Sequence, residues 1–452
     1  MHLHLLLVCV CLSVAVQCAL STTLDDITAQ YDLTWTSNIT TPIPSEPSRF
    51  GFSVAVDGQW AVVGAPEAGI KGIRGAAYLF HRDRDSDPFS LVQTLDTGDI
   101  QNAVAFGTAV AIQGDYMLVS APQGNEGKNS YVFAYQRIDG AWELVQCLVH
   151  VEEVTNFPGS GYGVTLSLSM WTDDATGNEY GWLAVGSPND GDFSGAVYVY
   201  GRGHAFGETS DDDKWILETT LTPDESKVWD CSYGDSVLVT QTSLVVGTQT
   251  TGNVDVYLND ETVTEGWQIV DYLEVDCLFP LSLSLYMAPR TGDPDDHLDT
   301  LVIGCGWWGP NIPDPFSPGD NGAFWVYERE EFSGFSNRPA PFELTQSVYS
   351  DPDHGEHYLA TSLYVDRDYM LVGAPGGTDA GLAVMDSALV VYKPTGSTPS
   401  DKWQQAQVIS DYDWDAQLGD VLAVDSDTNT VLAGMSFYDG WTGLVGVLQF
   451  DV

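Results

Sequence analysis

Three acidic segments of the sequence have the residue types that could bind a hard cation. They read DPDDHLD over 293–299, DSDTN over 425–429 and DDATGNE over 173–179. Calcium takes several oxygen ligands, commonly from alternating acidic positions around a turn glycine. The strongest candidate ligands are Asp293, Asp295, Asp299, Asp425, Asp427 and Asn429. Their segments lack that glycine, so solvated turns are the simpler interpretation, and calcium is the alternative.

A second candidate site is aromatic. Residues 306–316 read GWWGPNIPDPF, a long stretch that is rich in proline. Exposed aromatic rings suit sugars, peptides or a protein partner. The sequence therefore offers Trp307, Trp308 and Phe316 as ligand-binding residues. The alternative is that both tryptophans pack onto their own structural unit.

Catalytic signatures are weak. The sequence shows no nucleophile elbow, zinc-protease motif, phosphate-binding loop or dinucleotide fingerprint. His354 and His357 flank a Gly-Glu pair, but they have no third strong ligand beside them and are better explained as a solvated loop. No catalytic residue is therefore assigned.

The elements that must position these residues are best seen in residues 49–80. An aromatic–glycine pair, Phe50-Gly51, opens an alternating apolar run, and Asp57-Gly58 turns into a second run that ends Gly64-Ala65-Pro66. A third run covers 75–80. Period-two alternation around an Asp-Gly turn predicts a small antiparallel meander.

This unit recurs along the chain. Further copies open near residues 106, 162, 233, 279, 358 and 418, and most add a fourth strand that begins with Trp or Phe. Seven repeats of four strands predict a seven-bladed β-propeller that fills the chain after residue 18 as one domain.

The Phe-Gly and Gly-Ala-Pro letters resemble the FG-GAP repeats of the integrin alpha-chain propeller. The resemblance implies that the loop after Cys305 lies on the face where ligands bind, and that calcium sits in hairpins between first and second strands. No hairpin here matches the family pattern D-x-D-x-D-G-x-x-D. The chain also shows no leg domains, so the resemblance covers only the propeller.

The last repeat ends after its third strand. Residues 31–41 stand before Phe50 at the spacing that a fourth strand keeps in other repeats. We expect this segment to pair with residues 446–451, because sharing a blade between the termini satisfies backbone groups that would otherwise be unpaired.

The ends of the chain and its charge favour an extracellular protein. Residues 1–18 resemble a signal peptide, although His2 and His4 replace the usual basic residues. Asn38-Ile39-Thr40 is an acceptor for N-glycosylation, and no later apolar run is long enough to span a membrane. With 64 acidic and 16 basic residues, the net charge of −48 excludes nucleic acid and anionic membranes as partners.

Four cysteines follow the signal segment, namely Cys147, Cys231, Cys277 and Cys305. Secretion favours their oxidation. Cys277 precedes the first strand of blade five and Cys305 ends its second strand, which favours a disulfide between them. A Cys231–Cys277 pair competes with it.

Together these features predict a secreted, non-catalytic recognition propeller. Its partner would be an extracellular protein or a glycan, bound through loops on one face, with calcium as a possible support. The alternatives are an extracellular hydrolase with carboxylates at the mouth of the central channel, and an acidic structural coat protein. The oligomeric state is not predicted.

Overall fold

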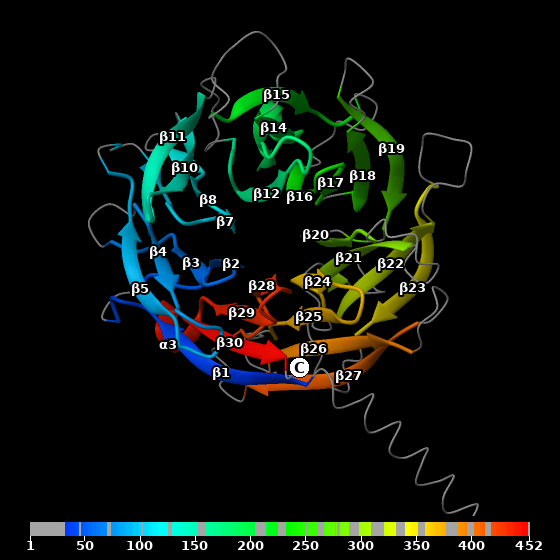
Figure 1. Cartoon of the computed structure of the whole chain (residues 1–452). Helices are drawn as coiled ribbons and strands as arrows, with labels where there is room; N and C mark the ends of the chain where they lie inside the picture. The colour runs from blue at the N-terminus through cyan, green and yellow to red at the C-terminus, as the bar shows by residue number, and fades with distance from the viewer. Residues whose placement is uncertain are drawn as a thin grey trace, which may run out of the picture.

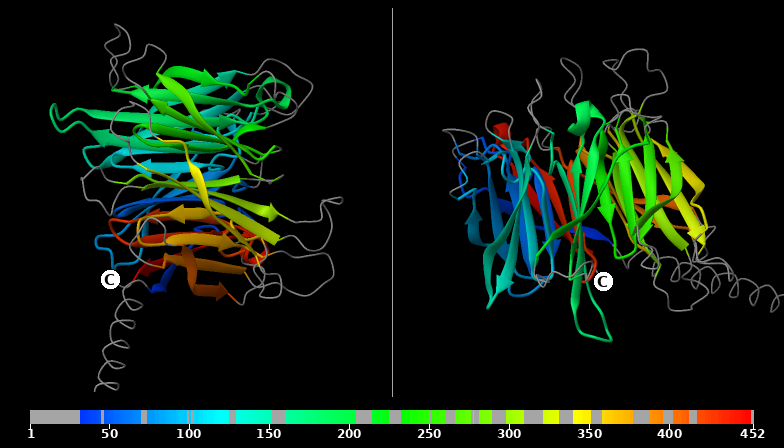
Figure 2. Two further views of the ribbon diagram at one scale, coloured as in Figure 1. Left: turned by 90° about the vertical axis from the view of Figure 1, so that its right-hand side faces the viewer. Right: turned by 90° about the horizontal axis from the view of Figure 1, so that it is seen from above.

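The computed structural model describes residues 32–44, 47–69, 74–98, 100, 103–124, 129–151, 160–203, 214–224, 232–249, 251–259, 266–275, 277, 281–288, 298–308, 321–330, 340–350, 358–376, 387–395, 402–411 and 417–450. Within these residues the strands form seven four-stranded antiparallel sheets. The sheets stand radially around one axis (Figure 1), and their strands run from one face of the ring to the other (Figure 2). The predicted fold class, a seven-bladed β-propeller, is confirmed.

Each blade runs outward from an inner strand, which is the first of its four. Blade one contains β2 (Ser53–Asp57), β3 (Trp60–Ala65), β4 (Ala76–His81) and β5 (Ser90–Leu95); blade two contains β7 (Val110–Gln113), β8 (Tyr116–Ala121), β10 (Asn129–Ile138) and β11 (Ala141–Val151). Blade three contains β12 (Thr165–Thr172), β13 (Glu179–Ser187), β14 (Ala196–Arg202) and β15 (Ile216–Leu221); blade four contains β16 (Tyr233–Val239), β17 (Ser243–Thr248), β18 (Asn253–Asn259) and β19 (Trp267–Glu274). Blade five contains β20 (Leu281–Tyr286), β21 (Leu298–Trp308), β22 (Asn321–Glu330) and β23 (Glu343–Tyr349); blade six contains β24 (Leu363–Val365), β25 (Met370–Ala374), β26 (Ser387–Pro394) and β27 (Trp403–Asp411).

Blade seven is shared by the two ends of the chain. It contains β28 (Val421–Asp425), β29 (Thr430–Met435) and β30 (Leu444–Phe450), and its outer strand is β1 (Leu33–Thr40). The pairing runs antiparallel from Leu33 opposite Phe450 to Thr40 opposite Leu444. The predicted closure is therefore confirmed, and the last blade has no unpaired edge beside β30.

Two faces follow from this order of strands. The loop face carries the connections between second and third strands and the connections from one blade to the next. The hairpin face carries the tight turns between first and second strands. Two four-residue helices, α2 (Asp190–Phe193) and α3 (Tyr438–Trp441), lie in second-to-third connections, and β6 (Ala103–Val104) pairs with β9 (Gln123–Gly124). None of the helices in the described part of the chain has the length and hydropathy needed to cross a bilayer.

The glycines of the repeat allow neighbouring blades to approach closely. A Cβ atom added to Gly64 would lie 2.0 Å from the carbonyl oxygen of Gly107 in blade two, and Ser53 donates its hydroxyl to that same oxygen at 2.9 Å. The contact recurs between Gly373 and Gly419, again with 2.0 Å for the added Cβ. Glycine is needed at these positions because any side chain would collide with backbone.

The hydrophobic core lies between blades. In the described residues the buried apolar side chains form seven clusters, and each cluster draws on two neighbouring blades. The aromatic residues that open the repeats, such as Phe50 and Phe106, are fully buried in these clusters. Burial of this kind is the main stabilising contribution to the ring.

Glutamine side chains also join outer strands of neighbouring blades. Each accepts a backbone N–H and donates to the carbonyl of the same residue, with donor–acceptor distances of 2.8–2.9 Å. The pairs are Gln146 with Trp215, Gln346 with Trp403, and Gln407 with Leu33. The last of them ties β1 to blade six as well as to blade seven.

Candidate functional site

A cavity of about 270 Å³ lies at the loop face between blades three and four. The exit of β15 forms one wall, and β16, β18, β19 and the β17–β18 connection form the others. The lining residues are Thr222, Pro223, Asp224, Tyr233, Thr248, Thr251, Asn253, Asp255, Tyr257, Ile269 and Tyr272. Its inner wall consists of strand residues and is therefore fixed by the fold.

Two tyrosines and a carboxylate form the polar floor of the cavity. The hydroxyls of Tyr233 and Tyr257 are 2.8 Å apart, and the Tyr257 hydroxyl donates to an Asp255 carboxylate oxygen at 3.5 Å. Tyr233 is the aromatic residue that opens the fourth repeat, and Asp255 is only 9% exposed. The repeat thus places a buried tyrosine pair beside a buried acid.

The ionisation of the floor follows from burial. Burial raises the pKa of Tyr257 to about 12, and the nearby Asp255 carboxylate adds to the effect. Burial likewise holds the pKa of Tyr233 well above its usual value, with Tyr257 and Asp255 as further causes. Both phenols are therefore protonated at neutral pH, and each can donate as well as accept a hydrogen bond.

The mouth of the cavity lies on the outer strand of blade four. Tyr272 is 39% exposed and Ile269 is 51% exposed, and both belong to β19. Exposed aromatic and aliphatic side chains beside a polar floor give the cavity one apolar wall that a ligand could contact.

The equivalent position between blades two and three is filled by side chains. His150 stacks on Tyr162 with ring centroids 5.2 Å apart, and Tyr198 packs against both rings at 5.1 and 5.3 Å. Tyr198 donates its hydroxyl to Asp190, and the hydroxyls of Tyr162 and Tyr200 are 2.7 Å apart. The tyrosine pair therefore recurs, and here the rings of His150 and Tyr198 pack beside it.

The register of the strands shows which residues differ between the two positions. In each blade the second strand carries the Gly-Ala-Pro motif or its equivalent. The residue just before that motif pairs with one residue of the third strand. In chain order these residues are Tyr78, Phe133, Tyr198, Asp255, Trp325, Val390 and Gly446. Only blade four has an acid there. The end of the preceding blade's outer strand also differs. Pro223 lies two residues after Leu221 in blade three, and His150 lies two residues after Leu148 in blade two. The two positions are equivalent because each leucine pairs with the corresponding valine of its blade's third strand.

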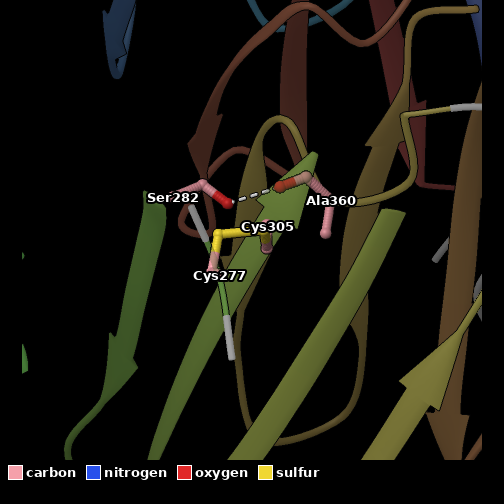
Figure 3. The surroundings of a disulfide bond; sticks show 4 residues. All are labelled: Cys277, Ser282, Cys305 and Ala360. Atoms are coloured by element: carbon pink, nitrogen blue, oxygen red, sulfur yellow. Dashed lines mark hydrogen bonds between the residues drawn. A yellow bond between two sulfur atoms is a disulfide. The ribbon is translucent and has the colours of Figure 1, made fainter. Parts of the chain in front are cut away.

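A disulfide stands behind one wall of the cavity. Cys277 and Cys305 are bonded with a Cα–Cα distance of 5.9 Å, which is the pairing that the sequence favoured (Figure 3). Cys277 also lies against Gly252, because a Cβ atom at Gly252 would be 2.8 Å from the Cys277 carbonyl oxygen and 2.1 Å from that of Val275. The bond therefore holds the chain that supports the connection carrying Thr251. Cys231, the alternative partner, lies outside the described residues.

The aromatic candidates are only partly described. The backbone of Trp307 and Trp308 continues β21 past a bulge and pairs Trp308 with Asn321, so the expectation that both lie in a loop is wrong. Aromatic residues favour strands, and the long partner β22 provides the pairing. Phe316 lies outside the described residues, and a ligand-binding role for these three residues stays a prediction.

The calcium candidates of blade five have other partners where they are described. Asp299 accepts a hydrogen bond from Arg329 Nε at 2.8 Å and another from the backbone of Ala288. Asp293 and Asp295 lie outside the described residues. Across the described part of the chain, no three His, Cys, Asp or Glu side chains are grouped to hold a metal ion.

The candidates of blade seven serve the contact between blades. Asp425 accepts a hydrogen bond from the backbone of Gly58 in blade one at 2.6 Å and another from the Thr428 hydroxyl at 2.8 Å. Asp427 donates its backbone N–H to Asp425, and Asn429 holds a left-handed turn at φ 54°. These contacts explain the acidic turn without a cation, while calcium binding itself stays a prediction.

The glycosylation candidate is accessible. Asn38 lies exposed on the outer strand β1, where its side-chain oxygen accepts a hydrogen bond from Trp35 Nε1 at 2.7 Å. Modification at this position stays a prediction. Residues 1–18, His354 and His357 lie outside the described residues.

Two partly buried carboxyls bear on the hydrolase alternative because they lie at the beginning of inner strands. Asp235 and Asp420 follow the opening glycine of blades four and seven, and burial raises the pKa of each to about 6. Their inner strands, β16 and β28, lie across the ring from each other (Figure 1). The described residues therefore supply single, partly buried acids at these two inner strands, and no catalytic partner is assigned to either.

The cavity residues were not predicted as a site from the sequence. Tyr233 and Tyr257 appeared there only as repeat positions, and Asp255 appeared only as a strand residue. The available signal was an acid at a third-strand position that is aromatic, aliphatic or glycine in the other repeats.

Comparisons with known proteins agree with the architecture. Residues 44–80, which contain β2, β3 and all of β4 except its last residue, match the family model of the FG-GAP repeat. No curated protein matches the chain in sequence. The resemblance to integrin alpha chains beyond the repeat stays a prediction.

Solved structures show similarity at the level of the fold. The WD40 domain of Toxoplasma gondii coronin is similar with a TM-score of 0.51 and 9% identity, over 94% of this chain and 87% of that one. A putative 6-phosphogluconolactonase from Bacteroides uniformis has a TM-score of 0.46 and 10% identity, over 80% of this chain and 88% of that one. At such low identity the likeness concerns the fold alone. The chain is thus a seven-bladed β-propeller that carries an FG-GAP repeat in its first blade.

Proposed function

We propose that this chain is an extracellular, non-catalytic recognition protein that binds a protein or glycan partner through its loop face. The observation that carries the proposal is the cavity between blades three and four, with its buried tyrosine pair, its carboxylate and its partly exposed Tyr272. A concave site with convergent polar groups and an aromatic wall is the usual form of a ligand site.

An extracellular location is supported by three features of different kinds. They are the signal-like segment at residues 1–18, the exposed acceptor Asn38 and the disulfide Cys277–Cys305. Disulfides persist mainly in oxidising compartments. A cell-surface or matrix partner follows from this location, and a net charge of −48 repels nucleic acid and anionic lipid.

Calcium remains part of the proposal as a support of the hairpin face, without an assigned set of ligands. The strongly acidic chain attracts divalent cations in general. Calorimetry with calcium on chelator-treated protein tests this point, and a chain that shows neither heat nor a shift in melting temperature has no such site.

The recognition function is tested by partner capture on immobilised, full-length secreted protein. Extracellular protein fractions and a glycan array are probed with and without calcium, using wild type, Tyr272→Ala and the control Tyr349→Ala. Tyr349 is also a partly exposed tyrosine on an outer strand, but it belongs to blade five. Retention that Tyr272→Ala weakens and Tyr349→Ala preserves supports the proposal. The absence of any retained partner refutes it, and release of a cleaved product would favour the hydrolase alternative.

A further inference from the structure

Arg49 is an arginine whose side chain makes no hydrogen bond within the described part of the chain. The side chain is 20% exposed, and its Nε atom is buried without a hydrogen-bond partner. Glu67 Oε1 lies 3.7 Å from Nη1, which is too long for a hydrogen bond. Because a buried donor without an acceptor is costly, we looked for an acceptor that a partner could bring.

Aromatic rings surround the guanidinium of Arg49. Its central carbon lies 4.4 Å from the centre of the Phe52 ring, 4.6 Å from that of Phe437 and 5.5 Å from that of Trp441. An aromatic ring attracts the positive charge but supplies no oxygen acceptor for the N–H groups. The rings therefore fix the side chain and leave its donors available.

Other arginines that contact aromatic rings do have acceptors. Arg137 contacts two tryptophan rings and donates from Nε to Asp115 at 2.6 Å. Arg329 contacts a phenylalanine ring and donates from Nε to Asp299 at 2.8 Å. In both cases a carboxylate completes the site, and Arg49 lacks this component.

Backbone contacts hold the cluster at the loop face, in the seam between blades seven and one. The Trp441 carbonyl, at the end of α3 in blade seven, accepts the backbone N–H groups of Ser48 at 2.9 Å and Arg49 at 2.8 Å. Trp441 has a left-handed φ of 76° and is 46% exposed. A strained residue of this kind persists only where its surroundings hold it. Arg49 and an exposed ring thus form a preformed surface.

The equivalent seam between blades three and four has no arginine at this position. There Ser232 donates its backbone N–H to the Phe193 carbonyl at 3.1 Å, as Arg49 does to that of Trp441. The backbone arrangement therefore forms without an arginine. A role in binding accounts for the residue better than a requirement of the fold does.

A carboxylate matches the free donors. The planar fork of arginine binds two oxygens of a carboxylate or a phosphate. Two acids stand near the site. One is Glu67, and the other is Asp420, where burial raises the pKa to about 6 and Arg49 counteracts part of the rise. A doubly charged phosphate would be repelled by these acids more strongly than a singly charged carboxylate.

The charge of the whole chain restricts the molecule that carries the carboxylate. A net charge of −48 repels glycans with many acidic groups and attracts basic proteins. Within such a surface, a single cation can fix the position of a basic partner by binding one of its acids.

From these observations we infer that Arg49, in the loop-face seam between blades seven and one, binds a single aspartate or glutamate carboxylate of a basic partner protein. The exposed Trp441 ring gives the neighbouring part of that partner an apolar contact. The inference rests on the proposed recognition function and specifies the chemistry of its partner.

The test uses fluorescence anisotropy on the full-length protein with two pools of labelled peptides. Both pools are rich in lysine and vary at neutral positions, but one has a fixed central glutamate and the other a glutamine. General attraction to an acidic chain favours the glutamine pool, which has one more net positive charge. We expect the glutamate pool to bind about tenfold more tightly. Equal affinity, or tighter binding of the glutamine pool, overturns the inference.

Matched variants locate the site. Arg49→Lys keeps the charge but lacks the planar fork, so it should lose most of the preference for glutamate. Arg137→Lys makes the same change at an arginine that already has Asp115 as its acceptor, and it should keep the preference. An undiminished preference in Arg49→Lys, or an equal loss in Arg137→Lys, overturns the inference. If Arg49→Lys does not fold, the two pools on wild type still decide.

Free glucuronate, followed by saturation-transfer NMR, is the sugar arm of the test. We expect no binding that depends on Arg49. Glucuronate binding that Arg49→Lys abolishes, together with equal affinity for the two peptide pools, assigns the site to an acidic sugar and overturns the inference.

Partner capture separates this inference from the proposed function. A captured partner should be retained less by Arg49→Lys than by wild type and Arg137→Lys. If wild type captures a partner but binds both pools equally, the inference fails and the recognition function stands. If wild type captures no partner and shows no preference for glutamate, both fail.

Discussion

The closure of the ring by β1 allows a quantitative prediction. Leu33 and Ile39 are the two buried side chains of this strand, with 2% and 3% exposure. Leu33 packs in the cluster between blades six and seven, and Ile39 packs in the cluster between blades seven and one. The double variant Leu33→Ala with Ile39→Ala should therefore loosen the seam on both sides of blade seven.

The magnitude follows from burial. Truncating a buried leucine or isoleucine to alanine typically costs about 2–5 kcal/mol. The two residues are six positions apart, roughly 20 Å along an extended strand, so their effects should add. The expected loss is about 4–10 kcal/mol, which is comparable to the whole stability of an ordinary domain, about 5–15 kcal/mol.

The assay is urea unfolding followed by tryptophan fluorescence, together with amide hydrogen exchange. Exchange should rise first in β30, whose residues pair with β1. Thr40→Ala is the matched control, because this β1 residue is exposed and its truncation removes no core contact. Protein from a host that does not glycosylate avoids the effect of this variant on the Asn38 acceptor. A double variant that loses less than about 1 kcal/mol would refute the closure argument.

Three further predictions concern the disulfide, one contact between blades and a carboxyl with a raised pKa. Replacing Cys277 and Cys305 by serine should lower the free energy of unfolding by about 3.5 kcal/mol, since the bond closes a loop with a sequence separation of 28 residues. Wild type in reductant should then melt like the variant. Equal melting temperatures of oxidised and reduced wild type would contradict the estimate. Gly373→Ala places its Cβ 2.0 Å from the Gly419 carbonyl oxygen and should destabilise the protein by about 1–3 kcal/mol or more in urea unfolding; an unchanged midpoint would show that the blades can separate freely. Burial raises the pKa of Asp420 to about 6, so the native state binds more protons than the unfolded chain between about pH 4 and 6 and loses stability as the pH rises through that window. The variant Asp420→Asn should therefore gain up to about 3 kcal/mol in free energy of unfolding at pH 7.5 and little at pH 3.5. An equal effect at both pH values would exclude the ionisation of Asp420 as its cause.

The architecture could be predicted from the sequence because it depends on local patterns that repeat. Phe50-Gly51 and Gly64-Ala65-Pro66 specify one meander, and the structure shows that their glycines are needed for backbone contact between blades. Counting meanders gives the number of blades, and a missing fourth strand after Val447 implies that the N-terminal segment supplies it. Each of these steps uses neighbours in sequence or the spacing of repeats.

The candidate site could not be predicted in the same way. The carboxylates of Asp299 and Asp425 looked like possible cation ligands, yet Asp299 pairs with Arg329 and Asp425 accepts from Gly58 in another blade. These partners are distant in the chain, so the spacing of acids in one hairpin carries no information about them.

The sequence by itself determined the seven blades, the shared last blade and the favoured disulfide, because strand alternation and repeat spacing are encoded locally. Only the tertiary structure decided that Asp255 and Pro223 lie across one interface and leave a space that His150 and Tyr198 fill one blade earlier. The physical reason is that a cavity is defined by the volumes of side chains from different strands. Those volumes can be compared only after the register of each blade and the contact between blades are known.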